Sequence, residues 1–276
     1  LKPGVDGTLT ADLVFLNAAA KILEAVAPEM KRVSLADVAA QLRDSTLQEL
    51  DLEVEAGRLL SFQKFLDDTG LEAVATCPKP VLDLCATEVL TMSRLDGARL
   101  VDASAGPEAE AAVADVIRVW ARSVVEHEFF HADVHGGNVL LLDDGKIGLI
   151  DFGIVGTLPP AVYGGVVDMA LAFNAQPRDY LALATALRDI GVVDVAAAGA
   201  FDAEAFAADL RKAFDAVEAN DAAAIVADVI AVSEKNNLVL PREFGLLTKQ
   251  AVYLNRYVTT LAPGLDVFQG DGLLAQ

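Results

Sequence analysis

The sequence predicts an α+β fold in which a small part with strands precedes a larger, mostly helical part. Three observations support this class. Short strand signals gather in the first third of the chain, a hairpin signal follows near residue 145, and almost everything after Gly153 has helical periodicity. We therefore expect a partial small lobe over residues 1–97 and a helical lobe over residues 98–276.

Two helices are expected to open the chain. Residues 9–27 carry apolar side chains at helical spacing, and Pro28 ends the pattern. Ser34 with Asp37 forms a capping signal for a second, acidic helix that should continue to about Asp67. The simplest interpretation of most carboxylates on this helix is a solvated face.

The next segments alternate between short strands and helices. Strands are expected over residues 81–84 and 88–92, closing on a turn at Asp96-Gly97. A helix is expected over residues 108–126, because one helical face collects its apolar side chains, namely Val113, Val116, Ile117, Trp120 and Val124. Trp120 should belong to the core. Five further helices are expected, over residues 161–175, 178–190, 203–219, 222–236 and 241–261.

Composition narrows the class of protein. The 276 residues carry a formal net charge of -20, so a nucleic-acid partner would be repelled. Mean hydropathy is high at +0.40, but no uninterrupted apolar run is long enough to span a bilayer. The spacing of Cys77 and Cys85 matches neither a redox pair nor a zinc knuckle, which favours a reducing cytoplasmic compartment. The chain opens with Leu1 and shows no signal peptide, and we expect an N-terminal portion to be missing.

Residues 131–153 contain the strongest chemical pattern in the chain. Two short apolar runs, 139–142 and 146–150, are joined by Asp143-Asp144-Gly145 and predict a β-hairpin. This hairpin would keep Asn138 and Asp151 at the same end. One amide oxygen and one carboxylate are hard ligands that leave room for water and phosphate around Mg²⁺.

Asp133 precedes this hairpin and completes the pattern. Asp133 lies on the loop just before the hairpin. There it could orient or deprotonate an attacking hydroxyl, as the catalytic-loop Asp does in kinases. A solvated turn rich in Asp and Gly is the alternative for any one of these residues. The ordered set of D-x-x-x-x-N, hairpin and D-F-G instead favours a protein-kinase-like site that holds ATP and Mg²⁺.

A competing pattern overlaps this loop. Residues 127–131 read H-E-F-F-H, which on a helix would give two zinc ligands and a glutamate base. The extended form of that motif would need Gly at 134 and His at 137, where the chain has Val134 and Gly137. His135 lies beyond an Asp and before two glycines, so a regular helix presenting three histidines is not expected. Zinc hydrolysis is therefore the lesser alternative.

The residues as a set resemble a known family. The segment His131-Ala-Asp133-Val-His135-Gly-Gly-Asn138, followed by Asp151-Phe-Gly153, is similar to the signature of the UbiB-like (AarF-type) atypical kinases. The family usually has Pro where this chain has Val134 and Gly136. Three more segments resemble family features, namely the E-x-D motif, the strand and hinge over the adenine, and the terminal helices: residues 49–55, 87–97 and 240–268.

The resemblance implies roles for individual positions. Asp133 would be the catalytic-loop carboxylate, and His131 and His135 would be catalytic residues of the same loop. Asn138 and Asp151 would be the metal ligands. On the nucleotide side the resemblance assigns three acidic residues, Glu49, Asp51 and Glu55.

These three acidic residues do not have equal support. Glu55 would pair with a nucleotide-binding lysine, and Glu49 and Asp51 would belong to the E-x-D motif. On one regular helix Glu49 and Asp51 would lie about 200° apart, whereas Asp51 and Glu55 would share a face. The family's lysine and its glutamine-containing extension would lie before Leu1, so the small lobe of this chain would be incomplete.

The function implied is ATP- and Mg²⁺-dependent phosphoryl transfer or ATP hydrolysis, in support of isoprenoid quinone biosynthesis. The implied partners are nucleotide and lipid or quinone-biosynthesis proteins, and peripheral contact with a membrane is left open. An aminoglycoside- or choline-kinase-like phosphotransferase is one alternative. A non-catalytic scaffold is another, because the chain alone is expected to bind nucleotide weakly and to be inactive.

Overall fold

The computed structural model describes residues 5–26, 51–127, 129–193, 201–216 and 222–265. Its contacts divide the chain into two compact units, each described here by itself. The first unit is Leu1–Lys64, Cys77–Arg94 and Asp151–Gly153, and the second is Phe65–Thr76, Leu95–Ile150 and Ile154–Gln276. Because both units are discontinuous in sequence, the expected lobe boundary at residue 97 stays a prediction.

The first unit contains helix α1 (Val5–Val26) and the larger part of helix α3 (Leu52–Thr69). Helix α1 confirms the first expected helix. Helix α3 begins later than the continuous helix that we expected to run to about Asp67. The reason is Asp51, whose Oδ1 accepts a hydrogen bond from the Glu53 amide at 3.1 Å and thereby caps the first turn. The expected start of that helix, near Ser34, lies outside the described residues.

Residues 77–94 of the first unit do not form the two expected strands. A 3₁₀ turn, η3 (Leu82–Leu84), replaces the first, and only isolated antiparallel bridges, Pro80 to Met92 and Ala86 to Val89, join the two sides. Leu82 and Leu84 are 58% and 60% exposed. Without a buried face, these apolar residues have no packing that would extend the pairing into a ladder.

The second unit contains a four-stranded sheet in the order β1-β5-β4-β2. The expected hairpin is confirmed as β4 (Val139–Leu142) and β5 (Ile147–Leu149), which pair antiparallel. Its turn needs Gly145, which has φ of 84° and donates its amide to Leu142 O. The outer strands are β1 (Ala75–Thr76), parallel to β5, and β2 (Gly97–Arg99), which begins within the segment expected to be only a turn. Short 3₁₀ turns, η2 (Leu71–Ala73) and η4 (Leu100–Asp102), flank these strands.

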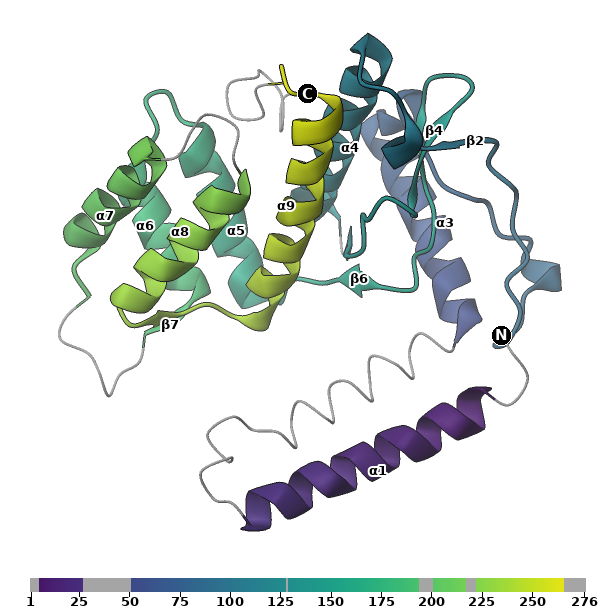
Figure 1. Ribbon diagram of the computed structural model, residues 1–276, viewed down its shortest axis with the longest axis horizontal. Coiled ribbons are helices and arrows are strands. Elements are labelled where there is room, and N and C mark those ends of the chain that lie inside the picture. The colour runs from purple at the N-terminus through teal and green to yellow at the C-terminus, as the bar shows by residue number, and fades with distance from the viewer. Residues whose placement is uncertain (1–4, 27–50, 128, 194–200, 217–221, 266–276) are drawn as a thin grey trace. The chain divides into compact units, whose positions relative to one another are not determined.

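Helices make up most of the second unit, as the sequence predicts. Helix α4 (Pro107–Glu126) buries Val113, Val116, Ile117 and Val124, and Trp120 is half-buried against the same core. The five helices expected after Gly153 are all present: α5 (Pro160–Asn174), α6 (Tyr180–Ile190), α7 (Ala203–Ala216), α8 (Ala222–Lys235) and α9 (Arg242–Leu261). Successive helices from α5 to α9 pack on one another, and α9 also packs on α4 (Figure 1).

Two small pairings complete the second unit. Strand β3 (Phe130–His131) pairs antiparallel with β6 (Val155–Gly156), and β7 (Val192–Val193) pairs with β8 (Leu238–Val239). The first of these pairs leads the chain out of α4 and into the loop that begins at His131. In the part of the chain that the structure describes, no helix is both long and apolar enough to cross a membrane.

Candidate active site

His131 is a buried residue that fixes the start of the loop carrying Asp133. Its ring is 1% exposed, its Nδ1 accepts the Asp133 amide at 3.1 Å, and its Nε2 lies 3.1 Å from Ile150 O. Because Nδ1 accepts, the ring hydrogen belongs on Nε2, which donates to Ile150 O. Trp120 Nε1 also donates to His131 O at 3.0 Å. His131 therefore ties the loop to the end of β5 and is too buried to meet a substrate.

Asp133 has each of its polar groups held in place. Its carboxylate Oδ1 lies 3.0 Å from Lys249 Nζ, and its Oδ2 lies 3.4 Å from His135 Nε2. Its backbone oxygen accepts the Asn138 side-chain amide at 3.0 Å. The Gly137 amide donates to His135 Nδ1 at 2.8 Å, so the His135 ring turns its Nε2 hydrogen toward Asp133. The result is a carboxylate of fixed orientation, with 18% of its side chain exposed.

Helix α9 fastens the backbone on both sides of Asp133. Gln250 is 0% exposed, and its Oε1 accepts the Val134 amide at 2.9 Å while its Nε2 donates to Ala132 O. Tyr257 donates its hydroxyl to Val134 O at 3.0 Å. Burial raises the pKa of the Tyr257 phenol, which keeps this donor protonated. Side chains of α9 thus supply the hydrogen bonds that the backbone of a neighbouring strand would supply in a sheet.

Asn138 presents an amide oxygen suited to a cation. It is 5% exposed, and its Nδ2 is engaged on Asp133 O. Its backbone is fixed as well, because its amide donates to His135 O and its oxygen accepts the Ile150 amide. For Oδ1, no hydrogen bond is recorded to the described residues. A hard oxygen oriented by a second bond on the same amide fits a magnesium ligand.

Asp151, in the first unit, has an unusual backbone. Its φ is +64°, a left-handed conformation that Asp tolerates because its side chain can bond locally. Here Oδ1 accepts the Gly153 amide at 3.2 Å. A Cβ added at Gly153 would lie 3.1 Å from that oxygen, so glycine leaves the carboxylate room. Such backbone strain in a non-glycine residue is often found at functional sites.

Helix α3 holds the backbone that follows Asp151. Glu55 Oε1 accepts the Phe152 amide at 3.0 Å, and Arg58 Nη1 donates to Phe152 O at 3.1 Å and to Gly153 O at 2.7 Å. The Phe152 ring is 0% exposed and lies 4.8 Å from the Phe62 ring. Burial raises the pKa of the Glu55 carboxyl, and the nearby Asp151 charge raises it further, against the lowering effect of the Phe152 amide and Arg58.

The other expected nucleotide-side residues are placed differently. Glu49 lies outside the described residues. Asp51 precedes α3 and caps it through the Glu53 amide, and its place on the nucleotide side stays a prediction. Asp51 is not part of the helix, because its side chain accepts a hydrogen bond from an amide in the first helical turn. The pairing of Glu55 with a lysine stays a prediction.

The H-E-F-F-H segment does not form the helix that the alternative zinc motif would need. Helix α4 ends at Glu126, and His127 follows it in extended conformation with its ring stacked on Phe65 at 5.0 Å. His131 already lies in strand β3, so the two histidines are not one helical turn apart. Within the described residues, no group of three or more His, Cys, Asp and Glu side chains could hold a metal ion.

Sequence reasoning predicted the loop and helix α9 but not the contacts between them. Lys249, Gln250 and Tyr257 reach residues 132–134 from more than 100 positions downstream. A polar glutamine between apolar residues of a core-facing helix was a weak signal of such a contact. Nothing in local spacing indicated which segment it would meet.

Comparisons with known proteins agree with this geometry. Residues 1–185 match the family model described as the ABC1 atypical kinase-like domain. An uncharacterised aarF domain-containing protein kinase of Arabidopsis thaliana, described as chloroplastic, is 36% identical over 98% of this chain and 55% of its own length. A probable protein kinase UbiB of Shewanella loihica is 26% identical over 98% of this chain and 50% of its own length.

A solved structure gives the same fold. The complex of Rv3197 with erythromycin from Mycobacterium tuberculosis superposes with a TM-score of 0.62 at 18% identity, over 94% of this chain and 66% of that one. The predicted α+β, kinase-like fold with a helical majority is therefore confirmed. The chain spans about half the length of the curated relatives it matches.

Proposed function

The chain belongs to the ABC1 atypical kinase-like family, and on that premise we propose that the protein transfers the γ-phosphoryl group of ATP, or hydrolyses ATP, with Mg²⁺. The contacts that fix the orientation of Asp133 are the observation that supports this proposal most strongly. Both carboxylate oxygens are held by cationic or N–H groups, and the backbone on either side is bonded to Gln250. A fixed carboxylate on a loop of this motif can accept the proton of an attacking hydroxyl.

The remaining residues would serve the nucleotide and its metal. Asn138 Oδ1 and the Asp151 carboxylate would hold Mg²⁺, which supplies positive charge to the triphosphate when bound. Both are hard oxygens oriented by hydrogen bonds of their own residue, so the donor set fits this ion. Glu55 and Arg58 fix the backbone after Asp151, and His131 fixes the loop before Asn138. Their role is to orient the ligands.

The pathway served by the reaction is inferred from relatives. Several are named as probable protein kinase UbiB, and we infer a role in isoprenoid quinone biosynthesis at a membrane surface. A strain without the protein should have less quinone. The wild-type gene should restore the quinone content, and a gene carrying Asp151→Asn should fail to do so.

Turnover of Mg-ATP by the full-length protein tests the chemistry. Asp133→Asn should lower kcat by about 100-fold or more, since it removes a base. Asp151→Asn should abolish metal-dependent turnover while it keeps the left-handed backbone, which Asn also adopts. Asp143→Asn, at an exposed hairpin-turn carboxylate, is the matched control and should leave ADP release unchanged. Equal turnover in all four proteins would refute the assignment.

A further inference from the structure

Lys249 forms an ion pair with Asp133, the candidate base. Its Nζ lies 3.0 Å from Asp133 Oδ1 and 5.8 Å from the centre of the Tyr253 ring. The side chain is 44% exposed, so its charged end is reachable from solvent. The next residue, Gln250, is fully buried and bonded to the loop, so the backbone that carries Lys249 is fixed relative to Asp133.

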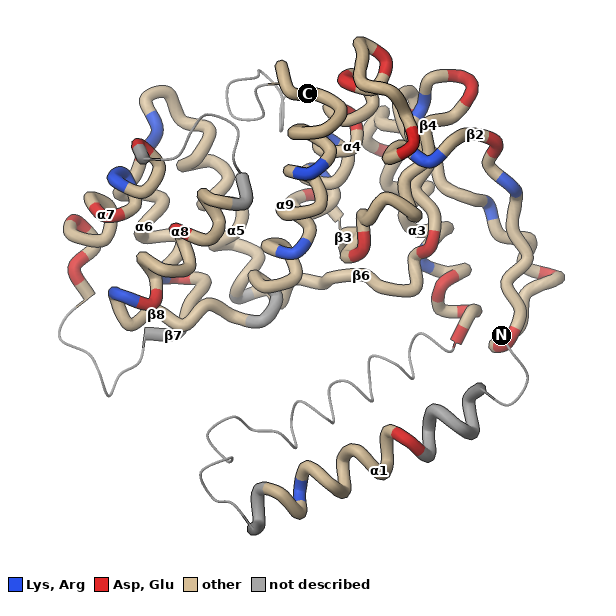
Figure 2. The backbone as a smooth tube through the Cα atoms, in the orientation of Figure 1, with Lys and Arg blue, Asp and Glu red and all other residues tan. Residues whose placement is uncertain are grey.

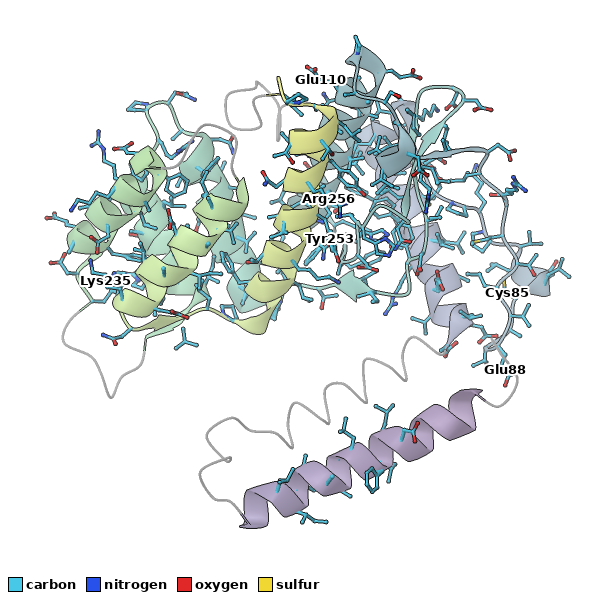
Figure 3. The ribbon with its side chains drawn as sticks, viewed as in Figure 1. Cys85, Glu88, Glu110, Lys235, Tyr253 and Arg256 are labelled. Carbon is cyan, nitrogen blue, oxygen red and sulfur yellow. The ribbon has the colours of Figure 1, made fainter. Side chains whose placement is uncertain are left out.

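The charge of α9 is unusual for this chain. The protein has 41 acidic and 21 basic residues, yet α9 has the sequence REFGLLTKQAVYLNRYVTTL, with three basic residues and one acidic residue. Figure 2 shows positive positions along the described part of this helix. Tyr253 and Arg256 continue from Lys249 along the same helix (Figure 3). In this acidic chain, α9 thus brings a positive charge to the Asp133 carboxylate.

We propose that Lys249 is a positioning residue for phosphoryl transfer, which deepens the function proposed above and rests on it. Lys249 holds Oδ1, and this fixes the carboxylate plane so that Oδ2, beside His135, faces the acceptor. In the step, Oδ2 takes the proton of the acceptor hydroxyl and the acceptor oxygen bonds to the γ-phosphorus. The bond from that phosphorus to the β-bridging oxygen breaks, and ADP leaves with the electron pair.

An ordinary surface ion pair is the alternative, and the chain contains one for comparison. Lys235 Nζ lies 2.6 Å from Asp209 Oδ2, with the lysine side chain 68% exposed. Lys235 lies at the end of α8, away from the labelled α9 residues (Figure 3). Exposed pairs of this kind contribute little to stability. Lys235→Met is therefore a matched control for Lys249→Met.

Steady-state kinetics of the full-length protein with Mg-ATP, with melting curves for each variant, test the role. Lys249→Met should lower kcat about tenfold or more and change KM for Mg-ATP less than about threefold, because the base loses its orientation while the nucleotide contacts remain. Lys249→Arg keeps a donor for Oδ1 and should recover much of kcat. Lys235→Met should keep wild-type kcat and KM, and all three variants should melt within a few degrees of the wild type.

The outcomes separate this inference from the proposed function. Wild-type turnover that is lost in Asp151→Asn but unchanged in Lys249→Met refutes the role of Lys249 and leaves the function intact. A loss in Lys249→Met that Lys249→Arg does not relieve, together with a lower melting temperature, also refutes it, because the effect is then structural. Absence of metal-dependent turnover in the wild type refutes the function and this role together.

Discussion

Asp151 has a strained, left-handed backbone conformation within the candidate site. Its left-handed backbone, at φ of +64°, is stabilised by its own Oδ1 bond to the Gly153 amide. Glu55 and Arg58 then bind the two peptide groups that follow. A residue in this conformation stays there only where its surroundings determine it. The carboxylate is thus oriented by backbone contacts before any ligand arrives.

Glu55 makes the stability of the protein depend on pH. Burial and the Asp151 charge raise the pKa of its carboxyl above the ordinary value of 4.5. Between that value and the raised one, the folded state binds more protons than the unfolded state, so the free energy of unfolding falls as pH rises. Glu55→Gln keeps an oxygen for the Phe152 amide and removes this dependence.

Urea unfolding from pH 4 to 8 measures the difference. The wild type should lose stability relative to Glu55→Gln as pH rises through this window, and the two curves should run parallel above it. Titration of other groups is common to both proteins and cancels in the comparison. Parallel curves over the whole range would show that the Glu55 pKa is not raised.

The sequence identified the residues of the loop but not their supports. Asp133, Asn138 and Asp151 are indicated by spacing, because a short loop and a hairpin fix their order along the chain. Gln250 is invisible to such reasoning, since it lies 118 residues from Ala132 and local spacing has no information about that contact. The single extra signal, a polar residue at a core-facing helical position, does not name its partner.

At the level of elements, α9 is the support of the loop. Gln250 and Tyr257 give it three hydrogen bonds to the backbone of residues 132–134. Because the groups are buried, their loss leaves donors and acceptors without water. The helix therefore contributes to the stability of the loop as well as to its geometry.

Gln250→Leu tests this support. The substitution leaves the Val134 amide and the Ala132 oxygen without their partner, and unfolding should become easier by about 2–4 kcal/mol, since each unsatisfied buried group costs about 1–3 kcal/mol. Urea denaturation measures this change. Thr259→Val, on the exposed side of the same helix, is the control and should shift stability by less than about 0.5 kcal/mol. A loss below about 1 kcal/mol in Gln250→Leu would show that Gln250 does not stabilise the loop.

Elements were predictable where their pattern was regular. Seven described helices, α1 and α4 to α9, and the β4–β5 hairpin follow from apolar periodicity and from the Asp-Asp-Gly turn. The two expected strands within residues 77–94 failed because their apolar side chains are exposed and lack a sheet to pack on. The start of α3 was misplaced because a single capping side chain, Asp51, outweighed the continuous helical pattern.

For the whole molecule, strong acidity sets the main requirement for binding nucleotide. A net charge of -20 repels a triphosphate, so binding must depend on cations, either as metal ions or as side chains brought to the loop. In our proposal, Asn138 and Asp151 provide the ligands for the metal ion. We propose that these two residues bind the metal of a metal–nucleotide complex.

Binding of Mn²⁺ together with ADP, followed by electron paramagnetic resonance, tests this claim without knowledge of the phosphate acceptor. Manganese takes the same hard oxygen ligands as magnesium and gives a signal that decreases on binding. In the full-length protein, ADP should promote binding of Mn²⁺, and Asp151→Asn and Asn138→Ala should each abolish this effect, while Asp143→Asn should not. Undiminished ADP-dependent binding of Mn²⁺ in Asp151→Asn would show that Asp151 is not a ligand of the metal.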